Sequence, residues 1–90
     1  MNDLISKAKH TWKDGNPEQA LRLLGVSTLN EDTDAHFLKG EIHYSRQEWG
    51  LALNCFRKVL QLDPSQIAAQ TYVELILNIL GFFHTDQFNP

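Results

Sequence analysis

Four histidines and one cysteine are the residues of this sequence whose types could bind a metal or carry a reaction. The histidines are scattered, and only His36 and His43 fall seven residues apart, where they could share one face of a helix. Two imidazoles two helical turns apart do not chelate one metal ion, so we expect packing or solvated histidines and no metal site. Cys55 has no second cysteine to pair with. Its place near the apolar face of an expected helix predicts a buried structural thiol.

An acidic run in the middle of the chain has the ligand spacing of a calcium-binding EF-hand loop. The residues at the ligand positions are Asn30, Asp32, Asp34, His36 and Glu41. The sixth position of such a loop requires glycine for its sharp turn, but Ala35 occupies it here. Helical periodicity also begins at Ala35, so we expect a helix start at this place and not a calcium site.

No motif of the common enzyme classes is present. The sequence contains no G-x-S-x-G, G-x-x-x-x-G-K-[ST], H-E-x-x-H or G-x-G-x-x-G, and no pair of cysteines. The chain therefore offers no recognisable acid, base or nucleophile for catalysis. We predict that the protein is not an enzyme, with no catalytic residues and no cofactor.

The charge of the chain argues against binding to nucleic acid. The formal net charge is −3, and the lysines and arginines form no basic stripe of the kind that a phosphate backbone requires. The first residues have interspersed charges and do not resemble a secretory signal. The most apolar segment, residues 72–83, contains Glu74 and Asn78 and is too short to span a bilayer. If Met1 is the natural start, we expect a cytoplasmic protein with no nucleic-acid and no membrane partner.

The clearest local pattern is an amphipathic helix between residues 48 and 64. Its apolar residues recur at three- and four-residue spacing on one helical face. They are Trp49, Ala52, Leu53, Phe56, Val59 and Leu60. Pro64 ends the helix because proline lacks a backbone donor and disfavours helical geometry at Asp63. The apolar face is wider than one neighbouring helix can cover, so the segments before and after it must supply partners.

A weaker copy of this pattern occurs 32 residues earlier in the chain. Aligning the two copies places Ala20 on Ala52, and the same offset places Ala8 on Gly40. A helix-turn-helix pair is therefore repeated.

The second copy resembles the tetratricopeptide repeat, whose period is about 34 residues with small, aromatic and proline positions at fixed offsets. The residues that carry the resemblance are Gly40-x-x-x-Tyr44, Ala52-x-x-x-Phe56 and Leu60-x-Leu62-Asp63-Pro64. The resemblance implies an all-α fold, a right-handed superhelical stack of about five helices in one domain over residues 1–90. Residues 1–32 would form a divergent repeat, 33–64 a good repeat, 65–81 a final capping helix and 82–90 a tail.

Local signals place the helix boundaries. Gly15 can adopt the positive φ that ends a helix, and Asn16 can cap the next one. Gly25 costs that second helix about 1 kcal/mol relative to alanine, so we expect it to end early. Gly40 in the middle of the third helix predicts close approach of a neighbouring helix backbone. Ser65 is expected to cap the final helix. The helices are expected at about residues 3–13, from 17, 34–46, 49–62 and 66–80, with a polar connector over 29–34.

The resemblance also implies a non-enzymatic protein–protein interaction module. In tetratricopeptide proteins the first helix of each pair lines a concave groove that holds a peptide or a partner helix. The groove positions here are Ile5, Lys9, Trp12 and Lys13 in the first helix and Phe37, Glu41, Tyr44 and Ser45 in the third. The rings of Trp12, Phe37 and Tyr44 either form an aromatic floor or pack between the helices. The lysines predict an acidic, partly apolar partner at one end, and Glu41 predicts a basic or donor-rich contact further along.

The expected final helix lacks the polar outer face that a capping helix usually has. It is apolar around nearly its whole circumference apart from Gln66, Gln70, Glu74 and Asn78. Either the tail with Phe82, Phe83 and Phe88 folds back over it, or a second copy of the chain covers it. The alternative function is therefore a structural homo-oligomer subunit, a homodimer in the simplest case. Its interface would include Tyr72, Leu75, Ile76, Ile79, Phe82 and Phe83.

Overall fold

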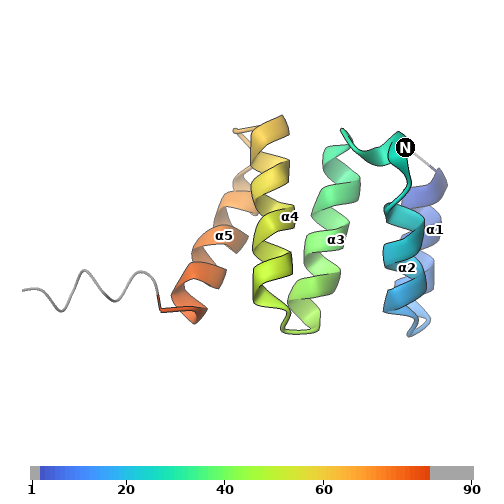
Figure 1. The fold of residues 1–90 in the computed structure, drawn as a ribbon, viewed down its shortest axis with the longest axis horizontal. Helices are drawn as coiled ribbons and strands as arrows, with labels where there is room; N and C mark the ends of the chain where they lie inside the picture. Colours follow the sequence, from blue (N-terminus) through green and yellow to red (C-terminus); the bar gives the residue numbers. More distant parts are fainter. Residues whose placement is uncertain (1–2, 82–90) are drawn as a thin grey trace, which may run out of the picture.

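Residues 3–81 of the chain are described by a computed structural model. These residues form five α-helices and no strand: α1 (Asp3–Lys13), α2 (Pro17–Leu24), α3 (Thr33–Ser45), α4 (Trp49–Leu62) and α5 (Ile67–Ile79). A short 3-10 turn, η1 (Ser27–Leu29), lies between α2 and α3. The α1–α2 and α3–α4 hairpins stand side by side, and α5 packs beyond α4 (Figure 1). This arrangement confirms the predicted all-α fold and is consistent with a helical repeat.

The turn between α1 and α2 forms as the sequence predicts. Gly15 has a φ of +90°, and the Asn16 side chain accepts a hydrogen bond from the backbone N–H of Gln19 at 3.2 Å. Pro17 opens α2, and Gly25 follows its last residue as the C-cap. The early end predicted for the second helix is therefore confirmed.

The connector and the start of the last helix differ from the prediction. The connector was expected to be polar, but Leu29 in η1 is 1% exposed and belongs to the core. Ser65 does not cap the final helix, because its hydroxyl and its backbone N–H both donate to Asp63 Oδ1, at 2.7 and 3.2 Å. The helix α5 begins at Ile67, and the side chain of its N-cap residue, Gln66, forms no capping hydrogen bond.

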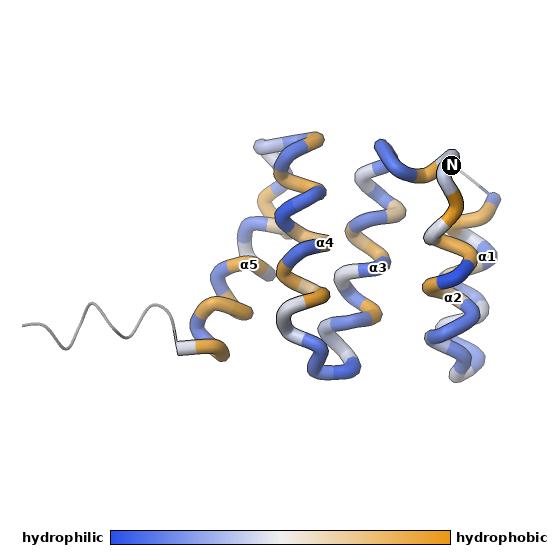
Figure 2. Tube along the Cα trace, in the orientation of Figure 1, coloured by the Kyte–Doolittle hydropathy of each residue, from blue (hydrophilic) through white to orange (hydrophobic). Residues whose placement is uncertain are grey.

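Two hydrophobic cores share the helix α3. The first core lies among α1, α2, η1 and α3, and its buried residues are Ile5, Ala8, Ala20, Leu24, Leu29, Ala35, Leu38 and Ile42. The second joins α4 to α5, with buried residues Ala52, Leu53, Phe56, Val59, Ala69 and Ile76. Phe37 and Tyr44 of α3 pack against this second core. Figure 2 shows the apolar positions recurring along the helices between polar ones. Because α3 faces both cores, it fixes the two hairpins to each other.

Gly40 lies where α3 meets the ring of Phe56. A Cβ atom at Gly40 would lie 2.7–2.9 Å from three ring carbons of Phe56, closer than real side chains pack. The predicted close approach is therefore present, but its partner is an aromatic ring of α4 and not a helix backbone. The same ring stacks on Tyr72 of α5, with centroids 4.3 Å apart.

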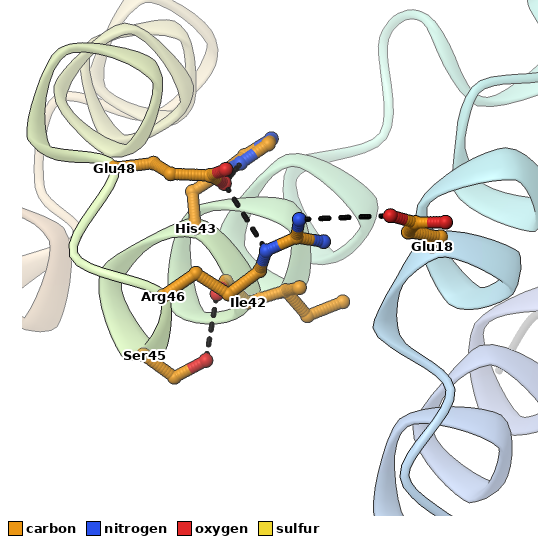
Figure 3. Close-up of polar contacts among 6 residues, drawn as sticks. All are labelled: Glu18, Ile42, His43, Ser45, Arg46 and Glu48. Atoms are coloured by element: carbon orange, nitrogen blue, oxygen red, sulfur yellow. Dashed lines mark hydrogen bonds and ion pairs between the residues drawn. The ribbon is translucent and has the colours of Figure 1, made fainter.

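Polar contacts join the two hairpins at the turn between α3 and α4 (Figure 3). His43 Nδ1–H donates to Glu48 Oε1 at 2.7 Å, and this hydrogen bond lowers the pKa of Glu48. Arg46 lies between two carboxylates, with Nε 3.5 Å from Glu48 Oε1 and Nη2 3.8 Å from Glu18 Oε2 on α2. Exposed ion pairs of this kind contribute little stability, so packing around α3 must hold the hairpins together.

Candidate functional site

Two adjoining hollows lie between α1 and α3, and we call them together the α1–α3 groove. The first has a volume of about 210 Å³ and is lined by Ile5, Lys9, Asp34, Phe37, Leu38 and Glu41. The second has a volume of about 260 Å³ and is lined by Lys9, Trp12, Lys13, Leu38 and Glu41. Lys9, Leu38 and Glu41 line both hollows, so the two form one continuous surface along the first helices of the two hairpins.

The structure brings six of the residues named from the sequence to this groove. They are Ile5, Lys9, Trp12, Lys13, Phe37 and Glu41. Tyr44 lines neither hollow, because its ring packs edge-on against Trp49 and Tyr72, with centroids 5.2 and 5.0 Å apart. Sequence reasoning missed Asp34 and Leu38. Both lie one helical turn or two from Glu41 on α3, so the same three- and four-residue spacing could have found them.

Phe37 connects the groove to the second core. Its ring lines the first hollow and also meets Phe56 and Tyr72 edge-on, with centroids 5.3 and 5.8 Å apart. Trp12 is half-buried beside the second hollow. Of the three rings considered for an aromatic floor, two therefore line the groove and Tyr44 packs between helices.

Glu41 is a half-buried carboxylate at the junction of the two hollows. Burial raises its pKa, and the positive charge of Lys9 opposes this shift. No hydrogen bond or ion pair joins the side chain of Glu41 to another residue of the described range 3–81. The pKa of Tyr72 is raised by burial first and then by the charges of Glu41 and Tyr44, so the Tyr72 hydroxyl lies in the field of this carboxylate.

Lys9 and Lys13 are exposed at the rim of the groove. Within residues 3–81 neither lysine forms an ion pair with a carboxylate. The groove thus has two basic side chains beside Trp12 and two acidic ones, Asp34 and Glu41, along α3. Both signs of charge remain available to a ligand.

Two of the residues considered for metal binding, His36 and Asp32, have structural partners. His36 Nε2–H donates to the backbone carbonyl of Asn30 at 2.8 Å, and Asp32 accepts a hydrogen bond from the backbone N–H of Ala35 at 3.1 Å as the cap of α3. In the described part of the chain no three His, Cys, Asp or Glu side chains are placed to hold one metal ion. Cys55 is partly buried, and burial raises the pKa of its thiol, which disfavours the reactive thiolate.

The face of α5 that carries Leu75 and Ile79 is exposed, as are Ile67 at the start of the helix and its C-cap residue, Leu80. Ile67 is 71% exposed, and Leu75, Ile79 and Leu80 are 45%, 47% and 40% exposed. Of the residues predicted for an oligomer interface, Leu75 and Ile79 lie on this face and Tyr72 is half-buried. Ile76 is not available to a partner, because it is fully buried in the second core. Phe82 and Phe83 lie outside the described residues, as does the Phe88 of the predicted tail.

Comparison with known proteins supports the resemblance drawn from the sequence. Residues 33–66, which contain α3, α4 and the turn after them, match the family model of the tetratricopeptide repeat. The match covers less than half of the chain. Neither the curated proteins nor the solved structures gave a significant match. No helix within residues 3–81 is long and apolar enough to cross a membrane.

Proposed function

We propose that this protein is a non-enzymatic interaction module that binds a peptide or a partner helix in the α1–α3 groove. Tetratricopeptide repeats generally mediate protein–protein interactions, and the second hairpin matches that family. The observation that carries the proposal is the groove itself. It combines an apolar floor at Ile5 and Leu38 with charged side chains that have no ion-pair partner among residues 3–81. Mixed surfaces of this kind suit a ligand that is amphipathic along its length.

Reversing the charges of Lys9 and Lys13 is expected to weaken partner binding by about tenfold and to reduce its dependence on salt. Both lysines lie at the rim of the second hollow, so they would attract acidic groups of the ligand. Peptides are first selected from a random peptide library displayed on phage. Their affinities for the parent and for the double variant Lys9→Glu, Lys13→Glu are then measured by titration at two salt concentrations. The double variant Lys7→Glu, Arg57→Glu is a matched control, since both residues are exposed and line neither hollow. Unchanged binding after reversal of both groove lysines would place the ligand elsewhere.

A structural homo-oligomer is the second candidate, and the exposed apolar face of α5 favours it. Glu74 is the one charged residue of α5. Two copies of the chain could therefore pair through this helix with little charge repulsion. Light scattering at increasing protein concentration separates the two functions. A self-associating subunit should double in mass, and Leu75→Glu with Ile79→Glu should keep it monomeric. A protein that stays monomeric up to high micromolar concentration would exclude this candidate.

A further inference from the structure

The unpaired carboxylate of the α1–α3 groove indicates which ligand chemistry the groove selects. We propose that the occupant presents one basic side chain, an arginine or a lysine, to Glu41 in the first hollow. About one helical turn away, it places a large uncharged apolar side chain in the second hollow beside Trp12. This inference rests on the proposed function of the groove and adds the class of peptide that it recognises.

The lining of the first hollow matches the two parts of a basic side chain. Ile5, Phe37 and Leu38 offer apolar contact, and the carboxylates of Asp34 and Glu41 outnumber the one ammonium group of the same lining, that of Lys9. Arginine and lysine combine an apolar stem with a cationic head, so the stem can cover the hydrophobic floor while the head reaches a carboxylate. The ring of Phe37 can also attract the cationic head through a cation–π interaction.

The burial of Glu41 makes a cationic ligand more favourable here than at an exposed carboxylate. A half-buried charged group without a hydrogen-bond donor costs free energy that a partner can recover. Burial is also the largest influence on Glu41, and it raises the pKa of this carboxyl despite the nearby Lys9. A guanidinium or ammonium group bound at Glu41 would replace the lost hydration with a charge-assisted hydrogen bond.

The lysines restrict the ligand to one basic anchor and give it a direction. Lys9 and Lys13 both line the second hollow, where a second cation would be repelled. That hollow is apolar at Trp12 and Leu38, so it suits an uncharged apolar side chain followed by an acidic residue, which the two lysines attract. Because Lys9, Leu38 and Glu41 belong to both hollows, the two anchors must lie close together. Residues three or four apart on a helix, whose Cβ atoms are about 5–6 Å apart, meet this requirement.

A random peptide library displayed on phage tests the inference when it is selected against the parent and against Glu41→Gln. The parent is expected to enrich peptides with arginine or lysine three or four positions from a leucine, isoleucine, phenylalanine or tryptophan. The Glu41→Gln protein should lose the basic preference and keep the apolar one. A peptide selected on the parent should bind this variant about tenfold more weakly or worse. Glu74→Gln is the matched control, because Glu74 is an exposed carboxylate of α5 and lines neither hollow.

Thermal melting of the free proteins ensures that a loss of binding is not a loss of fold. A carboxyl whose pKa is raised on folding holds its proton more firmly in the folded state. Its ionisation therefore costs stability as the pH rises from 4.5 through the raised pKa. Glutamine removes this cost, so Glu41→Gln should melt at neutral pH at a temperature no lower than that of the parent.

The outcomes separate this inference from the proposed function. The basic anchor alone would be overturned by one set of results. The selected peptides would bind more weakly to Trp12→Ala or to the lysine-reversed protein, but they would show no enrichment of basic residues and would bind Glu41→Gln as tightly as the parent. A library from which no selected peptide responds to any groove variant would overturn both proposals. Enrichment of acidic peptides that gain affinity for Glu41→Gln would also contradict the basic anchor.

Discussion

Replacing Phe56 with alanine is expected to lower the free energy of unfolding by about 3–5 kcal/mol. The ring is fully buried and lies at the point where α3, α4 and α5 meet. It stacks on Tyr72 at 4.3 Å, meets Phe37 edge-on at 5.3 Å and covers Gly40. Its removal would leave a cavity bordered by rings of two other helices, which cannot close without moving them. Domains of this size are stable by only about 5–15 kcal/mol, so the loss is a large part of the total.

Urea unfolding followed by far-UV circular dichroism measures this loss as a lower midpoint with an unchanged slope. Leu51→Ala on the same helix is the control, because Leu51 is 52% exposed and its removal should change stability by about 0.5 kcal/mol or less. If the two variants unfold at the same urea concentration, the second core is not organised around this ring. Peptide binding in the α1–α3 groove should also be weaker in Phe56→Ala, because Phe37 lines the first hollow and packs on Phe56.

The helices and their order were predictable because their signals are local. Gly15, Asn16 and Pro17 determine the turn before α2 through backbone geometry and one hydrogen bond within four residues. Pro64 likewise follows closely after the last residue of α4, Leu62. Such signals need no knowledge of the partner helices. The wrong prediction at Ser65 also has a local cause. Asp63, two residues earlier, accepts the hydrogen bond of the serine hydroxyl and leaves α5 without that cap.

Which neighbour each side chain meets was harder to predict, because α3 is apolar on two faces. Phe37 and Tyr44 are seven residues apart and share a stripe, yet Phe37 borders the groove and Tyr44 packs against Trp49 and Tyr72. Periodicity gives the face of a residue but not the element that covers it. The same limit explains Gly40, where the mid-helix glycine indicated a close contact without identifying the ring of Phe56.

Most of the groove lining could be predicted because it follows the repeat rather than any single residue. Lys9 and Glu41 occupy equivalent positions in the two hairpins, and both line both hollows. The charge of Glu41 was visible in the sequence, but its burial depends on how the helices pack around it. Its lack of an ion-pair partner depends on Lys9, on another helix, remaining beyond ion-pair distance. That distance is a tertiary quantity, which spacing alone cannot supply.

Gly40→Ala is expected to destabilise the protein by about 1–3 kcal/mol, although the same change in an open helix stabilises by up to about 1 kcal/mol. The added methyl group would lie 2.7 Å from Cζ of Phe56, inside the contact distance of two carbon atoms. Gly50→Ala in α4 is the matched control, because nothing lies within 4 Å of a Cβ at that position and Gly50 should follow the ordinary rule. Gly40→Leu should cost at least as much as Gly40→Ala.

A double-mutant cycle with Phe56→Leu shows whether the ring is the cause of this cost. Leucine shortens the side chain opposite Gly40 and gives the new methyl group space, so Gly40→Ala should cost less in that background. The coupling free energy between the two positions is expected to be about 0.5–3 kcal/mol, measured from urea midpoints of the four proteins. If Gly40→Ala stabilises the parent as Gly50→Ala does, α3 and α4 do not pack as closely as this contact requires. The register of α3 against α4 that places Gly40 over Phe56 would then be wrong. The position of α3 along the groove, which depends on that register, would be wrong as well.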